Sequence, residues 1–262
     1  MKYKLAEDAK PQVTLLLAAT AVTMLLWFIP YAEYLVYPIR LFVTFIHEGS
    51  HALMAVITGG SVASLTIASD GSGAVYSAPS SWLGAVLTSS AGYLGTTIFG
   101  VMMLYLIRRS VSPRKVLFAC GAFVGIMTIV FGILSPIFNF MSVKVPFSSL
   151  TFTAIAGLLL TAGLIVLSMY SSFRVATFAV AFLAVQCLLN ALTDLKALLW
   201  INAPLVGSDI QTDAGNMAAA TFVPGFVWVI LWIVISVIMI TIGLRMFAAT
   251  RRTAASDSVF VD

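Results

Sequence analysis

Long apolar segments follow one another along most of this chain of 262 residues. A helix needs about 20 consecutive apolar residues to cross the hydrocarbon core of a bilayer. Only 9% of the residues are charged, whereas about a quarter are charged in a typical soluble domain. The pattern predicts an all-α polytopic membrane protein in which residues 1–262 form a single membrane-embedded domain. About seven transmembrane helices are expected, near residues 13–29, 37–58, 82–107, 116–134, 150–170, 175–200 and 222–247.

Basic residues predict the orientation of these segments, because connections rich in lysine and arginine remain on the cytoplasmic side. Three basic clusters, at residues 108–115, at Arg174 and at residues 245–252, follow one another at intervals of two segments. They therefore share one side, and the connections at residues 59–81 and 201–221 are expected on the other. The same alternation places the N-terminus outside, although the first ten residues contain three lysines, which favour the cytoplasm.

Both histidines of the chain lie in one five-residue stretch of the second apolar segment, His47-Glu48-Gly49-Ser50-His51. This is the HExxH pattern of zinc hydrolases: positions i and i+4 share a helix face, and the glutamate reaches a water on the metal. The alternative is two core histidines beside an unrelated carboxylate. Ionised groups near the centre of a bilayer cost about 2.5–3.5 kcal/mol each on insertion scales, so the pattern favours a metal site in which Glu48 is catalytic.

A hydrolytic zinc site takes three protein ligands and keeps one position open for water. The chain has no third histidine, and its other glutamates, Glu7 and Glu33, both precede the motif. The third ligand is therefore sought among the aspartates. Asp194 is preferred, because it lies in the sixth segment on one helical stripe with Asn190, and polar groups within a membrane helix mark functional sites.

Two alternatives to this choice remain open. The stripe that contains Asp194 also carries Gln186 and Thr193, so it is also compatible with a hydrogen-bonded seam between helices. Asp209 and Asp213 are the other candidate ligands, although their sequence context favours a solvated loop or the cap of the last helix. The expected depth in the bilayer supports Asp194. The histidines lie in the second half of the second segment and Asp194 in the second half of the sixth, and both segments are expected to run outward.

The residues of the motif resemble the site-2 protease family of intramembrane zinc metalloproteases, in particular its compact bacterial branch without a PDZ domain. The resemblance includes Ala52-Leu53-Met54-Ala55 and Thr58-Gly59-Gly60 after the motif, and Asn190 with Asp194 four positions later. It implies that Asp194 completes the Zn²⁺ site and that Asn190 helps to bind substrate. The chain departs from the family where Leu195 follows Asp194 in place of a glycine.

Residues 62–76 have strand character on both sides of the turn Gly71-Ser72-Gly73, which is a hairpin signature. In the family that the chain resembles, this segment is a β-hairpin that dips into the membrane and pairs with an unwound substrate, so Gly71 and Gly73 are expected at the substrate. A transmembrane helix that unwinds for hydrolysis needs new backbone hydrogen bonds, and a strand edge provides them. The alternative is a plain surface hairpin.

Small residues recur through the third segment, between Gly84 and Gly100. Glycine, alanine and serine let helix backbones approach closely within a membrane. This segment is therefore expected to pack against the helix that carries the histidines.

The chain is thus expected to be a multi-pass protein of the bacterial cell membrane that hydrolyses peptide bonds of membrane-spanning substrates. Its expected partners are the lipid bilayer and a membrane-protein substrate. The net charge of +4 indicates no nucleic acid, because the basic residues lie at segment ends. The alternatives are an inactive or metal-transporting protein that retains the zinc site, and a zinc hydrolase acting on a lipid or soluble peptide. The oligomeric state is not indicated by the sequence.

Overall fold

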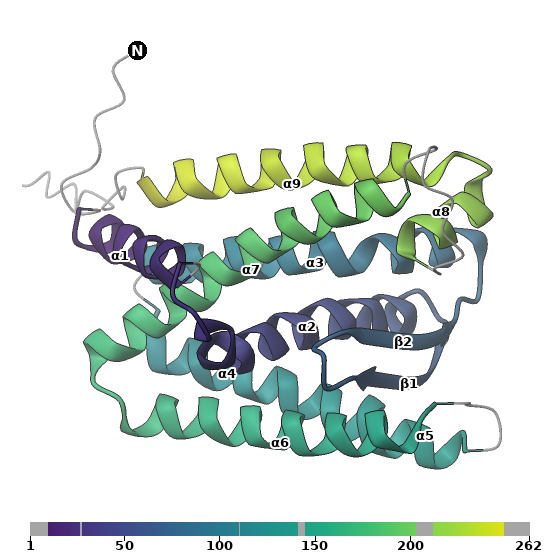
Figure 1. Cartoon of the computed structure of the whole chain (residues 1–262), viewed down its shortest axis with the longest axis horizontal. Helices are drawn as coiled ribbons and strands as arrows, with labels where there is room; N and C mark the ends of the chain where they lie inside the picture. The colour runs from purple at the N-terminus through teal and green to yellow at the C-terminus, as the bar shows by residue number, and fades with distance from the viewer. Residues whose placement is uncertain (1–9, 27, 110, 141–144, 203–211, 249–262) are drawn as a thin grey trace, which may run out of the picture.

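The computed structural model describes residues 10–26, 28–109, 111–140, 145–202 and 212–248 (Figure 1). The elements are α1 (Lys10–Leu26), α2 (Ala32–Ile57), β1 (Ser61–Ile67), β2 (Gly73–Ala78), α3 (Trp82–Arg108), α4 (Pro113–Met127), the π-helix η2 (Thr128–Leu134), α5 (Ser135–Phe138), α6 (Phe147–Tyr170), α7 (Phe173–Ile201), α8 (Asp213–Thr221) and α9 (Gly225–Ala248). The predicted combination of a helical bundle with one small β-hairpin is confirmed.

Five helices of the described chain are long and apolar enough to cross a membrane: α3, the continuous stretch Pro113–Phe138, α6, α7 and α9. They indicate a multi-pass integral membrane protein. The expected number of about seven is not confirmed. The described part of helix α1 has 17 residues, at the lower limit for a span, and α2 carries Glu33, Arg40 and Glu48 together with both histidines.

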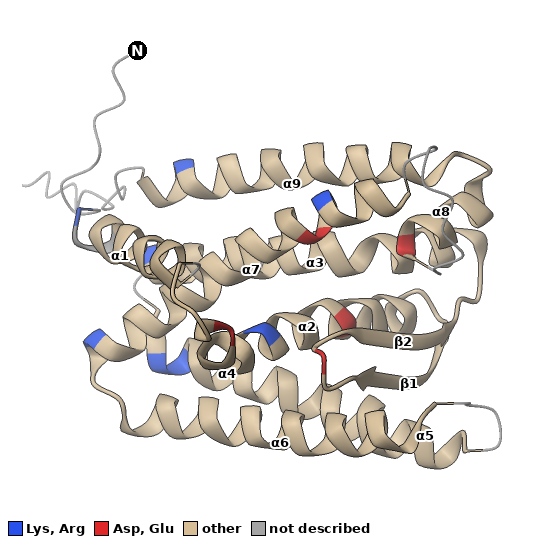
Figure 2. Ribbon diagram, in the orientation of Figure 1, with Lys and Arg blue, Asp and Glu red and all other residues tan. Residues whose placement is uncertain are grey.

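The long helices run roughly side by side, and the hairpin and α8 lie together at one end of the bundle (Figure 1). Most lysines and arginines gather at the other end (Figure 2). Arg108 ends α3, Arg174 lies in the first turn of α7 and Arg245 in the last turn of α9, so each of the three basic clusters has a described residue at this end of the bundle. The described part of helix α1 begins at this same end with Lys10.

The two strands of the hairpin pair antiparallel, and they have different surroundings. Strand β1 is mostly buried against η2 and α6: the amide of Ile67 donates to the hydroxyl of Thr153 (2.7 Å), and the hydroxyl of Ser135 donates to the carbonyl of Val62. Strand β2 is largely exposed and has no second strand partner in the described chain. The hairpin is therefore fixed to the bundle through β1, and the outer edge of β2 is free.

The small residues of α3 bring its backbone directly against α2, as predicted. A Cβ atom added at Gly95 would overlap the side chain of Ser50, and one added at Gly92 would overlap the Nε2 atoms of His47 and His51. Only glycine fits at these positions, so α3 forms one wall of the space in front of the histidines.

Candidate metal centre

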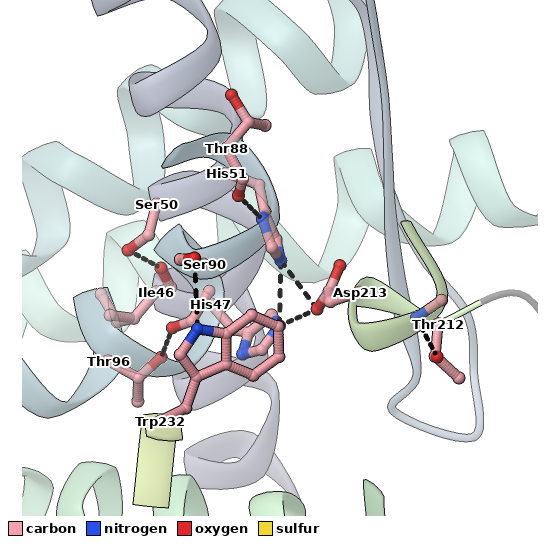
Figure 3. Close-up of polar contacts among 12 residues, drawn as sticks. Ile46, His47, Ser50, His51, Thr88, Ser90, Thr96, Thr212, Asp213 and Trp232 are labelled. Carbon is pink, nitrogen blue, oxygen red and sulfur yellow. Dashed lines mark hydrogen bonds and ion pairs between the residues drawn. The ribbon is translucent and has the colours of Figure 1, made fainter. Parts of the chain in front are cut away.

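The two histidines of α2 point their Nε2 atoms at each other, 3.1 Å apart (Figure 3). The Nδ1 atom of His51 lies 2.6 Å from the carbonyl oxygen of Thr88 on α3. A carbonyl can only accept, so Nδ1 carries the proton, and in the neutral ring Nε2 keeps its lone pair. This arrangement is typical of a histidine whose second nitrogen is oriented for a metal ion.

The third group at this point is the carboxylate of Asp213, the first residue of α8. Its Oδ2 atom lies 3.2 Å from Nε2 of His51 and 3.6 Å from Nε2 of His47 (Figure 3). The ligand atoms of the three residues all lie within 4.8 Å of one another. Tetrahedral Zn²⁺ with bonds of about 2.0–2.2 Å places neighbouring ligands about 3.3 Å apart, so these spacings fit zinc. Gly92 leaves the necessary space on the α3 side.

Helix α8 is held in place at both ends. At its start the hydroxyl of Thr212 accepts from the amide of Gly215 (3.0 Å) and contacts Oδ1 of Asn202, just after α7, at 3.2 Å. At its other end the indole of Trp82 on α3 donates to the carbonyl of Ala220 at 2.8 Å. These contacts aim Asp213 at the histidines from a helix of only nine residues.

The electrostatic environment of Asp213 favours its ionised form. Burial alone would raise the pKa of this carboxyl. The interactions with His51 and His47 together lower it by more, so the pKa of Asp213 lies well below its ordinary value. The carboxylate is therefore available as an anionic ligand at neutral pH.

Asp194, the predicted third ligand, is not among the described residues whose ligand atoms group with those of the histidines, whereas Asp213 is. Asp194 instead lines a separate cavity together with Asn190, as expected for two residues on one helical stripe. Elsewhere on the stripe, Gln186 donates to the hydroxyl of Thr23 on α1 at 3.0 Å, so this part of the stripe is a seam between helices. Asp209, the other alternative, lies outside the described residues.

Glu48 is buried beside the histidines, with 6% of its surface exposed. Strand β2 passes directly over it: a Cβ atom added at Gly73 would lie 2.5–2.8 Å from three side-chain atoms of Glu48. Gly73 therefore lies at the candidate site. Gly71 lies in the turn with a φ of +83°, which favours glycine, and it adjoins Arg40 rather than the histidines.

Two cavities meet at Glu48. The outer cavity, of about 940 Å³, is bounded by β2, α3 and α8 and also reaches Asp213. The inner cavity, of about 230 Å³, is lined by the polar residues of α7 and by Arg40. The residues that line both cavities are His47, Glu48, Gly73 and Tyr93. The candidate metal centre thus lies where a large cavity and a smaller polar cavity share their lining.

Comparison with known proteins gives one result. The family model described as Peptidase M50B-like matches residues 16–243, a range that contains every residue of the candidate centre. No curated protein and no solved structure matches the chain.

Proposed function

Because the chain belongs to the Peptidase M50B-like family, we propose that it is an intramembrane zinc metalloprotease that hydrolyses peptide bonds of membrane-spanning substrates. The family match confirms the resemblance to the site-2 protease family. Membership of this family implies a membrane metallopeptidase. The single observation that carries the finer proposal is the position of Glu48. Its carboxylate lies beside two metal-competent histidines, at the junction of two cavities and under the free strand of the hairpin.

His47, His51 and Asp213 would hold the Zn²⁺ ion. When bound, the ion supplies a Lewis acid that polarises the substrate carbonyl and lowers the pKa of water from about 15.7 toward about 7. Asp213 is assigned as third ligand in place of Asp194, because among the described residues it alone has a carboxylate oxygen within 3.6 Å of both Nε2 atoms.

Glu48 is proposed as the general base and acid. It accepts a proton from the attacking water and returns it to the nitrogen of the departing amine when the peptide C–N bond breaks. Its burial next to the histidines keeps the carboxylate close to the reacting atoms and restricts the bulk water around them.

The substrate is proposed to enter the outer cavity as an extended strand along β2. Residues 73–77 of this strand line the outer cavity, and its outer edge has backbone groups without a strand partner in the described chain. An unwound helix that adds to this edge regains backbone hydrogen bonds, which the membrane interior does not provide. Gly73 would lie next to the scissile bond, and Asn190 would contact the substrate from the inner cavity.

The basic end of the bundle is proposed to face the cytoplasm, as the positive-inside rule requires. The hairpin and α8 lie at the opposite end (Figure 2). This orientation places the metal centre toward the extracytoplasmic half of the membrane.

The test is Glu48→Gln in purified protein, with Glu33→Gln in the first turn of the same helix as the matched control. We expect wild type and both variants to retain zinc. Cleavage of a panel of synthetic transmembrane-helix peptides should fall about 10²–10⁴-fold in Glu48→Gln alone, because only the base is removed. A Glu48→Gln protein that cleaves at the wild-type rate would rule out the protease mechanism, and zinc without any cleavage by wild type would favour metal binding or transport.

A further inference from the structure

Tyr93 follows Gly92 in α3 and faces the candidate metal centre. Its ring meets the edge of the His47 ring, with the centroids 4.6 Å apart and the planes at 83°. On the other side the ring of Trp232 stacks on it at 5.7 Å, and the indole of Trp232 donates to the hydroxyl of Ser90 at 3.2 Å. The Tyr93 ring is 9% exposed and is therefore held rigidly between α2 and α9.

The hydroxyl of Tyr93 is not sealed in the protein core. Tyr93 lines both cavities, and the carboxylates of Asp213, Asp194 and Glu48 are all within electrostatic reach of its oxygen. Within the described part of the chain no hydrogen bond engages this hydroxyl, and its oxygen is not among the fully buried polar atoms without a partner. A phenol is protonated at neutral pH, so an O–H donor borders the space where substrate would lie.

The other polar groups around Glu48 are less suited to donate at this point. The amide nitrogen of Asn190 donates to the carbonyl of Gln186 on its own helix at 2.9 Å. The guanidinium of Arg40 packs against the turn at Gly71. Besides Tyr93, the residues that line both cavities are His47, a candidate metal ligand, Glu48, the proposed base, and Gly73, which has no side chain. Tyr93 is therefore the one side chain of this set that can supply a neutral donor.

We propose that Tyr93 is a catalytic residue whose hydroxyl donates a hydrogen bond to the oxyanion of the tetrahedral intermediate; this inference rests on the proposed protease function. The oxygen of water forms a bond to the carbonyl carbon, and the carbonyl π electrons move onto its oxygen. The Tyr93 O–H stabilises that charge without losing its proton. When the charge returns to re-form the C=O bond, the C–N bond breaks, and the nitrogen takes the proton held by Glu48.

The test compares Tyr93→Phe with Tyr105→Phe. Tyr105 lies in the same helix, and its hydroxyl accepts from Arg109 at 2.8 Å, far from the candidate centre. The probe is an N-acetylated, C-amidated leucyl-leucine phosphinic pseudo-dipeptide, whose tetrahedral phosphinate mimics the oxyanion. Its affinity for the zinc-loaded proteins is measured by calorimetry in detergent, and zinc affinity is measured separately by competition with a chelator.

We expect Tyr93→Phe to keep its zinc affinity and to bind the phosphinate about 100-fold more weakly than wild type, within the range known for loss of one oxyanion donor. Tyr105→Phe should match wild type in both measurements. A phosphinate affinity that Tyr93→Phe leaves within threefold of wild type would overturn the inference, and so would a loss of zinc in this variant, which would mean that the hydroxyl supports the metal site and not the oxyanion. If zinc-loaded wild type itself does not bind the phosphinate, the proposed function fails first, and the inference fails with it.

Discussion

Helices α7 and α8 each bring one aspartate toward the histidines of α2, but they hold it in different ways. Asp194 lies well inside a 29-residue helix that could cross the membrane, and it faces the inner cavity. Asp213 is the first residue of a nine-residue helix that only touches the end of the bundle, and it reaches both histidines. The long helix therefore supplies a polar wall, and the short helix supplies the candidate ligand.

The difference shows what a helix terminus contributes to a metal site. The first turn of a helix carries unpaired N–H groups and the positive end of the helix dipole, which stabilise a carboxylate there. A carboxylate in the middle of a helix has neither advantage. Asp213 also depends on its cap, because the contacts of Thr212 fix the direction in which α8 starts.

Replacing each of the two aspartates with alanine tests this difference between α7 and α8 most directly. Asp213→Ala should weaken zinc binding at least about 1,000-fold, since loss of a group outside the first ligand shell already costs about 10–100-fold. Asp194→Ala should stay within about tenfold of wild type. Zinc affinity is measured by competition with a chelator, and proper folding is checked by circular dichroism.

The opposite result would return the third ligand to α7. If Asp194→Ala lost its zinc and Asp213→Ala kept it, the spacing of Asp213 and the histidines in the structure would not represent the metal-bound protein. The assignment of Glu48 as the base would survive that outcome, because Glu48 lines both cavities.

A second prediction tests whether the ion binds beside Gly92, between α8 and α2. Gly92→Ala places a methyl group against the Nε2 atoms of both histidines. Overpacking of this kind costs up to about 3 kcal/mol, so zinc affinity should fall about 100-fold. The control is Gly163→Ala in α6, where an added Cβ meets nothing within 4 Å and alanine should stabilise the helix by about 0.5–1 kcal/mol. Equal zinc affinity in the two variants would mean that the ion does not lie beside Gly92.

The parts of this protein that the sequence predicts are those encoded over short distances. His47, Glu48 and His51 are placed by one helical turn, and the hairpin follows from the glycines of its turn. The close packing of α3 follows from its small residues. In each case a local pattern is enough, because the geometry of one element, or of two consecutive elements, fixes the contact.

The sequence offers Asp213 only as an alternative ligand, because α8 gives a weak signal. Its nine residues are mostly small, and they lie beyond a segment outside the described residues. Thr212 followed by Asp213 is a typical helix start, and it was the one available indication of a capped helix at this point. The direction of α8 toward α2 depends on tertiary contacts, which a local sequence pattern does not encode. The same holds for Tyr93, whose proposed role depends on its contacts with His47 and Trp232.

The expected number of membrane helices is not confirmed for a related reason. Apolar length alone gave about seven, but α1 is short and packs against α7, where Thr23 accepts a hydrogen bond from Gln186. Hydropathy does not distinguish a helix that crosses the bilayer from one that lies within the protein beside a longer helix.

The smallest predicted effect concerns the caps of the two helices that were compared. Thr212→Ala removes the N-cap of α8 and the contact with Asn202, and Ser172→Ala removes the N-cap of α7, where the serine accepts from Val175 at 3.3 Å. Each variant should lose about 0.5–2 kcal/mol of unfolding free energy. Only Thr212→Ala should also weaken zinc binding, by about tenfold, because the cap orients Asp213; Thr212→Ser, which keeps the hydroxyl, should restore it. Zinc affinities that fall equally in Thr212→Ala and Ser172→Ala would show that general stability controls the site and that the start of α8 has no special part in it.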